Sequence, residues 1–304
     1  AASNKPRVSL MGLPRSGKTS ISKVVFQKMS PHDSLSMEST TKTIKTDISN
    51  NPFMQLQVWD YSGRLDLTDA EADAEFLNCS ALVFVIDAQS VEAEFNEALT
   101  KLLVTVKKAF RVNQTISLEV FIHKVDGLSD DQKIESQREV QQKLKEELLD
   151  ARLDQVSPNV YLTSIYDHSI FEAFSKVVQK LIPEVTTLAY LLDALASHCR
   201  IEKVFLFDVI SKLYVATDSA PVDMQSYELC SDMIDVVIDV SCIYGGKEDG
   251  VHDGLAYDSE SASVMKLNNG MALYLREVGR FLALVCIMRE DCLDVQGLLE
   301  FNFQ

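Results

Sequence analysis

The sequence lacks the features that mark metal-binding, secreted and membrane-spanning chains. Its six cysteines are scattered and no two stand in C-x-x-C spacing, so neither a zinc site nor a redox pair is predicted. Free, buried thiols in a reducing compartment are the expected state. No apolar run approaches the roughly 20 residues that a membrane helix needs, and no signal-peptide pattern is present. We expect a cytoplasmic protein without direct membrane insertion.

Positive charge is also scarce. Lysine and arginine total 29 against 45 acidic residues, which gives a net charge of −16. Such an excess of negative charge disfavours nucleic acid and anionic membrane surfaces as partners. Apolar residues are abundant at 46% of a 304-residue chain. The length and the apolar content predict about two globular domains.

The first motif is a phosphate-binding loop. Residues 12–19, Gly-Leu-Pro-Arg-Ser-Gly-Lys-Thr, match G-x-x-x-x-G-K-[ST] between an apolar run at 8–11 and a helix-like run at 20–28. The glycines let backbone N–H groups turn toward a phosphate, and the helix adds its positive N-terminal end. Lys18 reaches the outer phosphates and the Thr19 hydroxyl can ligate Mg²⁺. A chance glycine-rich turn is the alternative, but the flanks favour a nucleoside di- or triphosphate site.

The second motif follows a predicted hairpin, with strands at 43–48 and 53–59. The second strand runs into Asp60-Tyr61-Ser62-Gly63, a D-x-x-G sequence. Asp60 can hold Mg²⁺ through water, and the Gly63 N–H can contact a γ-phosphate. The motif is common by itself, but its place after the phosphate loop and an apolar strand supports a nucleotide site.

Arg64 stands where many GTPases carry a glutamine that orients the attacking water. A guanidinium cannot accept a proton or orient water in the same way. Either this arginine impairs hydrolysis, or it is a solvated surface charge. The acidic segment 65–76 has helix character and is expected to move when the γ-phosphate is lost.

The third motif is His123-Lys124-Val125-Asp126, at the end of an apolar strand at 118–122. A carboxylate at Asp126 can accept both N–H groups on the Watson–Crick edge of guanine, and it would reject adenine. The stem of Lys124 can cover the face of the base. The familiar form of this motif begins with Asn, so H-K-x-D alone is weak, and plain surface charges remain an alternative.

Strands that alternate with helices predict a mostly parallel sheet in the first half of the chain. Further strands are expected at 81–86 and 160–163, and helices at 92–110, 132–149 and 171–182. Ligands of such sheets bind beyond the carboxyl ends of the strands. Gly12, Asp60, Asp126 and Ser164 all fall at such ends, which is the strongest internal agreement in the sequence.

The pattern changes after Pro183, so we predict domains at 1–183 and 184–304. The second half is expected to be α+β. Its predicted helices are 187–197 and 223–244, and its predicted strands are 203–207, 212–217, 263–267, 272–277 and 281–288. The acidic stretch 245–263 is expected to be mobile. No catalytic motif is present here, which favours a dimerisation role.

The order of these motifs resembles the Ras-like GTPase superfamily, and more narrowly the Rag GTPases of the C/D type, fungal counterparts included. The segments that carry the resemblance are 12–19, 38–40, 59–60, 121–131, 161–171, 221–229 and 234–241. They cover nearly the whole chain, and histidine at the start of H-K-x-D is characteristic of this subtype. Arg64 and segment 65–76 depart from the family, whose chains also continue beyond Phe303 into a further helix.

The resemblance implies a P-loop Ras-like G domain followed by a roadblock-type (longin-like) domain, with GTP or GDP and Mg²⁺ as cofactors. Its metal ligands would be Thr19, Asp60 and the switch residue Thr40. The nucleotide-binding set would be Arg15, Ser16, Gly17, Lys18, Thr19, Ser20, Ser34, Thr40, Gly63, His123, Lys124, Asp126, Ser164 and Ile165.

The resemblance also implies partners and a place in the cell. They are an A/B-type Rag subunit paired through the C-terminal domains, a Ragulator-like scaffold, the TOR kinase complex and a folliculin-type GAP, at the lysosomal or vacuolar surface. Three functions therefore compete. The first is a slow GTPase switch, the second is a nucleotide-holding binding module with little hydrolysis, and the third is a P-loop ATPase or small-molecule kinase, which Asp126 disfavours.

Overall fold

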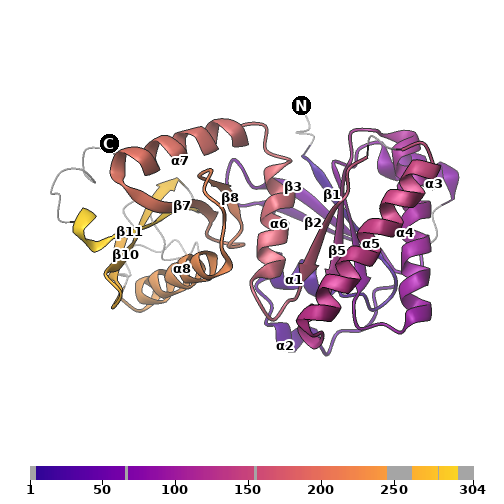
Figure 1. Cartoon of the computed structure of the whole chain (residues 1–304), viewed down its shortest axis with the longest axis horizontal. Helices are drawn as coiled ribbons and strands as arrows, with labels where there is room; N and C mark the ends of the chain where they lie inside the picture. The colour runs from indigo at the N-terminus through magenta and orange to yellow at the C-terminus, as the bar shows by residue number, and fades with distance from the viewer. Residues whose placement is uncertain (1–4, 66–67, 154–155, 245–261, 280, 294–304) are drawn as a thin grey trace, which may run out of the picture. The chain divides into compact units, whose positions relative to one another are not determined.

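The computed structural model describes residues 5–65, 68–153, 156–244, 262–279 and 281–293. The chain divides into two compact units. The first comprises Ala1–Ser49 and Gln55–Val177, and the second comprises Asn50–Met54 and Val178–Gln304. Figure 1 shows the chain coloured from its N-terminus to its C-terminus, with many of the helices and strands labelled.

The first unit is built on a six-stranded, mostly parallel sheet, which confirms the predicted α/β class. The strands lie in the order β2-β3-β1-β4-β5-β6, and β2 alone among them runs antiparallel to its neighbour. The strands are β1 (Arg7–Gly12), β2 (Ile44–Ser49), β3 (Gln55–Asp60), β4 (Ala81–Asp87), β5 (Ser117–His123) and β6 (Asn159–Thr163). β1 and β4 lie at the centre of the sheet, and nearly all their residues are buried, as a central parallel strand requires.

Helices cover both faces of this sheet. They are α1 (Lys18–Gln27), α2 (Pro31–Ser34), α3 (Asp69–Phe76), α4 (Glu92–Val112), the 3₁₀ turn η1 (Val125–Gly127), α5 (Asp130–Asp150) and α6 (Ser169–Gln179). Alternate residues of β4 and β5, such as Phe84, join the core with α3, α4 and α5. On the other face, the ring of Phe174 in α6 lies 5.3 Å from those of Phe121 in β5 and Phe26 in α1. Figure 1 shows α1 and α6 together, apart from α3, α4 and α5.

Two elements of the first unit differ from the sequence prediction. The polar stretch after α1 contains the short helix α2, which begins at a proline suited to a first helical turn. The helix predicted over 65–76 begins only at Asp69. Thr68 caps it, because its hydroxyl accepts from the Glu71 N–H and the Glu71 carboxylate accepts from the Thr68 N–H.

The second unit has a five-stranded antiparallel sheet in the order β8-β7-β11-β10-β9. Its elements are α7 (Val185–Cys199), β7 (Ile201–Asp208), β8 (Tyr214–Thr217), α8 (Met224–Tyr244), β9 (Ala262–Lys266), β10 (Met271–Gly279), β11 (Leu282–Arg289) and the 3₁₀ turn η2 (Glu290–Cys292). Figure 1 shows α7 and α8 on either side of this sheet. The α+β prediction for this half is confirmed.

Aromatic rings form the core between α8 and the sheet. Phe205, Phe207, Tyr214 and Tyr227 lie with their ring centroids 5.4–6.4 Å apart, and all four are buried. The strand predicted from residue 212 begins at 214, because Lys212 takes a left-handed conformation with φ of 59°. Most of the predicted mobile stretch, 245–261, lies outside the described residues.

Within the described part of the chain, no helix combines the length and apolar content that a membrane crossing needs.

Candidate functional site

The phosphate loop joins the end of β1 to the start of α1, as the motif predicts. Gly17 adopts a φ of 98°, which favours glycine. A Cβ atom there would also lie 2.5 Å from the ring of His123, so a side chain at this position would displace the ring. The first helical residue after this turn is Lys18, and the N-terminal N–H groups of α1 therefore begin at the loop.

Lys18 is buried inside the loop that it follows. Its Nζ donates to the Gly12 carbonyl at 3.0 Å, to the Leu13 carbonyl at 2.7 Å and to the Ser16 hydroxyl at 3.3 Å. Burial lowers the pKa of this lysine to about 8, and the nearby Asp60 carboxylate opposes the shift. An anion at the mouth of the loop would favour the charged ammonium further.

Three oxygen-bearing side chains meet at the start of α1. The Thr19 Oγ1 donates to the Asp60 carboxylate at 2.5 Å and lies 2.6 Å from the Thr40 Oγ1. The second carboxylate oxygen, Asp60 Oδ1, is buried and has no hydrogen-bond partner within the described residues. Burial raises the pKa of Asp60. A buried carboxylate oxygen beside two hydroxyl groups is a donor set that fits a hard divalent cation such as Mg²⁺.

The D-x-x-G loop lies directly against the phosphate loop. A Cβ atom at Gly63 would lie 2.2 Å from the backbone nitrogen of Pro14, so glycine is required by this close approach. On its other side, the Gly63 carbonyl accepts a hydrogen bond of 2.9 Å from Lys101 Nζ in α4. The next residue, Arg64, is exposed and lines the same cavity as Lys18.

His123 is the last residue of β5, and its buried side chain lies between the end of β6 and the phosphate loop. Its Nδ1 lies 3.0 Å from the hydroxyl of Thr163 at the end of β6. Its ring packs so close to Gly17 that it leaves no room for a Cβ atom there. Complete burial, with the charge of Lys124 nearby, lowers the pKa of His123 to about 3. The imidazole is therefore neutral at physiological pH. It occupies the place of an uncharged side chain, as the Asn of the familiar motif would.

The residues predicted to recognise a base come together at the ends of β5 and β6. Asp126 is exposed, and its carboxylate accepts a 2.6 Å hydrogen bond from the Ser164 hydroxyl. Ser164 is held in turn by its N–H, which donates to the Ser169 hydroxyl at 2.9 Å. Ile165 is largely buried beside it. Asp126 itself lines a cavity, together with Lys124 and Ile165.

Most of the predicted site residues line one cavity of about 760 Å³. This volume suits a drug-sized or nucleotide-sized ligand. The predicted residues on its wall are Arg15, Gly17, Lys18, Thr19, Ser20, Ser34, Thr40, Gly63, His123, Lys124, Asp126 and Ile165. Ser16, Asp60 and Ser164 lie behind the wall, where they contact Lys18, Thr19 and Asp126 respectively.

Ser34 reaches the cavity from α2, where its hydroxyl donates to the Pro31 carbonyl at 2.7 Å. Sequence reasoning missed several other wall residues, among them Leu35, Met37, Gln89 and Tyr166. Gln89 and Tyr166 carried a usable signal, since each closely follows the carboxyl end of a parallel strand. Leu35 and Met37 lie in an irregular segment that no motif marks.

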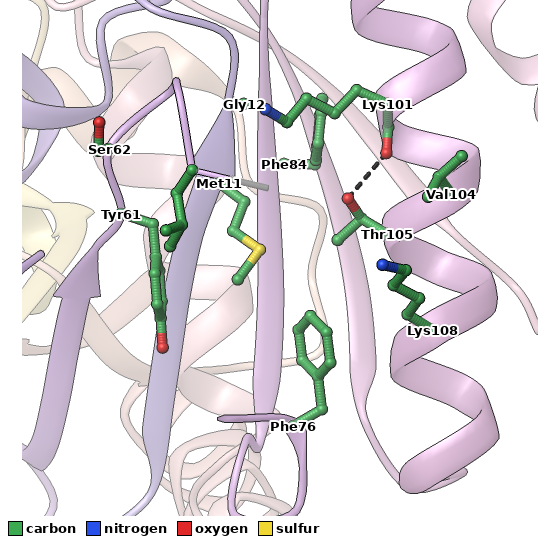
Figure 2. Close-up of a pocket in the computed structure, with 11 residues that line it drawn as sticks. Met11, Gly12, Tyr61, Ser62, Phe76, Phe84, Lys101, Val104, Thr105 and Lys108 are labelled. Atoms are coloured by element: carbon green, nitrogen blue, oxygen red, sulfur yellow. Dashed lines mark hydrogen bonds between the residues drawn. The ribbon is translucent and has the colours of Figure 1, made fainter. Parts of the chain in front are cut away.

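A second, smaller cavity of about 200 Å³ lies beneath the D-x-x-G loop. Figure 2 shows Met11, Phe76 and Phe84 around it, with Lys101 and Lys108 of α4 along one side. No sequence motif predicted this space, which is mainly apolar. It borders Tyr61 and Ser62 and therefore adjoins the loop that Gly63 belongs to.

Comparison with known proteins gives consistent results along the chain. The family model described as "Gtr1/RagA G protein conserved region" matches residues 7–234. The chain is 60% identical to human Ras-related GTP-binding protein C over 100% of its own length and 75% of that protein. It is 50% identical to Schizosaccharomyces pombe GTP-binding protein gtr2 over 99% and 95% of the two chains. Identity to Dictyostelium discoideum Ras-related GTP-binding protein A is 25% over 76% of each.

Proposed function

The chain belongs to the Gtr1/RagA family of G proteins, and we propose that it is a C/D-type Rag subunit that switches between GTP and GDP. The observation that carries this proposal is the convergence of three motifs on one cavity. Lys18, Thr19 and Asp126 line the same 760 Å³ cavity, and Asp60 lies behind its wall in contact with Thr19. These three groups match the outer phosphates, the Mg²⁺ that accompanies them and the base of a bound nucleotide, respectively.

Each group has a distinct task in the proposed site. Lys18 neutralises the outer phosphates and holds the loop backbone in place. Thr19, Thr40 and Asp60 would hold Mg²⁺, which screens phosphate charge when bound. Asp126, held by Ser164, accepts from the guanine edge, while His123 keeps the phosphate loop and the base loop at a fixed separation.

Hydrolysis is expected to be slow. Intrinsic GTPase rates without an activating protein are on the order of 10⁻⁴ to 10⁻³ s⁻¹ even where a glutamine orients the water. Here the corresponding position is Arg64, which lines the cavity but whose side chain has no carbonyl oxygen to orient water. We therefore assign Gly63, Lys18 and the metal ligands to charge stabilisation, and assign no general base.

The second candidate function is a nucleotide-holding subunit with almost no hydrolysis, and Arg64 is the observation that favours it. Single-turnover GTP hydrolysis by wild type and Arg64→Gln, each alone and with an A/B-type subunit, separates the two. Equal, slow rates would support the switch. A rate near zero for wild type with measurable turnover in the variant would support the holding subunit. Failure of every form to bind guanine nucleotide would overturn both.

The wider role proposed here follows from the family resemblance. The chain would pair with an A/B-type Rag subunit through its C-terminal roadblock-type domain, taken as residues 184–304 after a G domain at 1–183. The heterodimer would bind a Ragulator-like scaffold on the lysosomal or vacuolar surface and signal amino-acid supply to the TOR kinase complex. A folliculin-type GAP would act on its bound GTP.

A further inference from the structure

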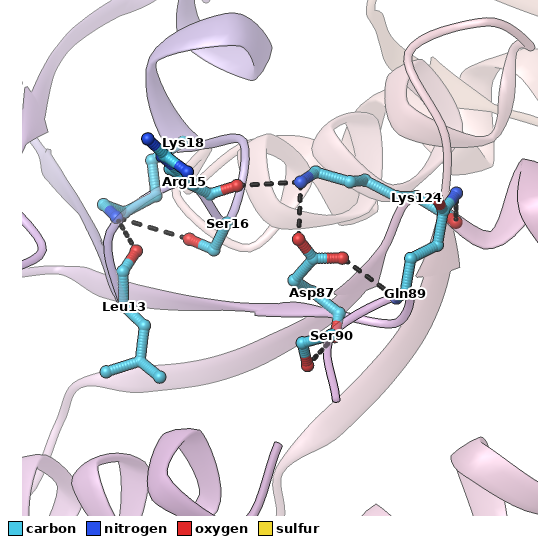
Figure 3. A network of polar contacts seen from close by, with 8 residues as sticks. All are labelled: Leu13, Arg15, Ser16, Lys18, Asp87, Gln89, Ser90 and Lys124. Atoms are coloured by element: carbon cyan, nitrogen blue, oxygen red, sulfur yellow. Dashed lines mark hydrogen bonds and ion pairs between the residues drawn. The ribbon is translucent and has the colours of Figure 1, made fainter. Parts of the chain in front are cut away.

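A loop that carries none of the three motifs supports the base-recognition end of the cavity. It begins at Asp87, the last residue of β4, and continues through Gln89 and Ser90 (Figure 3). The Asp87 Oδ2 accepts a 2.5 Å hydrogen bond from Lys124 Nζ, and the Asp87 Oδ1 accepts from the Gln89 N–H at 2.9 Å. The two carboxylate oxygens of Asp87 therefore have separate partners, one in its own loop and one in the base loop.

Lys124 is held at a second point as well. Its Nζ also donates to the Arg15 carbonyl in the phosphate loop at 2.8 Å. The ammonium thus bridges the phosphate loop and the end of β4, and Lys124 is 109 residues from Arg15 in sequence. Figure 3 shows its side chain reaching to these partners. Because the ammonium is fixed at its far end, the aliphatic stem is held along the cavity wall.

The backbone of Lys124 is held too. This residue has a φ of 66°, a left-handed conformation that is unfavourable for a side-chain-bearing residue. The Gln89 side chain donates from Nε2 to the Lys124 carbonyl at 2.8 Å. The strained peptide leads into the turn that carries Asp126, so Gln89 fixes the start of that turn.

We propose that Asp87 and Gln89 are positioning residues for guanine-nucleotide binding, acting through the side chain and the backbone of Lys124. This inference rests on the proposed function, because it assumes that Lys124 covers the base. Asp87 keeps the stem of Lys124 extended over the base. Gln89 holds the turn that carries Asp126 in the position from which its carboxylate reaches the edge of the same base. Asp87 lies behind the cavity wall and acts through Lys124. Gln89 lines the cavity, and its amide N–H is engaged with the Lys124 carbonyl.

The test is the release rate of a fluorescent GDP analogue in the presence of excess unlabelled GDP. Asp87→Ala should speed release about five-fold, the effect of losing one partly exposed charge-assisted contact. Asp87→Asn retains an acceptor for the Gln89 N–H and should show a smaller increase. Glu172→Ala is the matched control, since the Glu172 side chain is 21% exposed, as is that of Asp87, and pairs with Lys176 within α6.

A double-mutant cycle separates positioning from general stability. In a Lys124→Met background, Asp87→Ala should cause no further acceleration, because its partner is already absent. Unchanged release in Asp87→Ala and Asp87→Asn, or additive effects of Asp87→Ala and Lys124→Met, would overturn the proposal. A wild-type chain that binds no guanine nucleotide would instead contradict the proposed function, and this inference with it.

Discussion

At the scale of single residues, the buried imidazole of His123 makes a prediction about pH. Its pKa is about 3 in the folded chain, against about 6.5 in an unfolded chain. Between these values the unfolded chain binds one more proton, so folding stability must fall as the pH drops below about 6.5. The limiting slope is about 1.4 kcal/mol per pH unit.

His123→Asn should remove this dependence, because an amide does not titrate. The measurement is the free energy of unfolding by urea at intervals from pH 7.5 to 4.5. Wild type should lose more stability than the variant over this range. Asp60 and Asp208 have raised pKa values and act in the opposite direction, but they are present in both chains. Parallel curves for the two chains would show that His123 is not buried in its neutral form.

Residues that act through local motifs were predictable from the sequence, and residues that act through distant partners were not. Lys18, Asp60 and Asp126 follow strand ends in a known spacing, so their convergence could be foreseen. Asp87 could not, because its partner Lys124 is 37 residues away and neither position shows a pattern linking the two. Only the folded chain brings β4 and β5 side by side.

At the scale of elements, α3 is joined to the sheet by buried Phe76 and by one polar contact, the carboxylate of Glu75. The Glu75 Oε2 accepts a 2.6 Å hydrogen bond from the Tyr61 hydroxyl and forms an ion pair with Arg7 at 3.5 Å. The Arg7 side chain is only 8% exposed, and its guanidinium lies 4.2 Å from the ring centroid of Trp59. The polar part of this attachment therefore involves a largely buried guanidinium, two of whose nitrogens have no hydrogen-bond partner within the described residues.

Glu75→Ala should destabilise the chain by about 1–3 kcal/mol, because it leaves the Arg7 guanidinium without its carboxylate. Asp73→Ala is the control from the same helix. It removes a pair with Arg111 in which both side chains are more than half exposed, and it should change stability by less than about 1 kcal/mol. The measurement is urea unfolding. Equal effects of the two substitutions would contradict the role assigned to Glu75.

Element boundaries show why buried strands are easier to predict than helix ends. The apolar run of β4 was predicted to within one residue, because burial on both faces requires continuous apolar sequence. The start of α3 was misplaced by four residues, because a capping contact between Thr68 and Glu71 fixes it and overall composition does not. The short helix α2 was missed, since four residues carry no periodicity.

At the scale of the whole molecule, the second unit presents an apolar stripe on α8. Val236, Val240 and Ile243 are 47%, 49% and 71% exposed and are spaced to share one helix face. Exposed apolar groups clustered in this way mark an interaction surface. In the proposed heterodimer this stripe is where an A/B-type subunit would pack.

Val240→Asp should weaken pairing with an A/B-type subunit at least ten-fold, because it places an unpaired charge in an apolar contact. Light scattering after size-exclusion chromatography of the co-expressed pair measures the result. Leu149→Asp is the control, since this α5 residue is 56% exposed and belongs to the first unit. A stable pair in Val240→Asp would move the proposed interface away from α8.

The sequence predicts only part of which residues belong to each of the two units. The change of pattern near Pro183 comes from linear composition and periodicity. The second unit also includes residues 50–54, the turn between β2 and β3. No local pattern assigns a five-residue turn to a unit whose remaining residues begin at Val178.

We propose that Asp126 recognises guanine in the 760 Å³ cavity. Calorimetric titration of wild type and Asp126→Asn with GDP, XDP and ADP tests it most directly. Wild type should prefer GDP by at least about ten-fold, the value of one or two hydrogen bonds to a charged acceptor. The variant should prefer XDP, because its amide can donate to the xanthine oxygen. Retained preference for GDP in Asp126→Asn, or equal binding of all three nucleotides by wild type, would contradict the account.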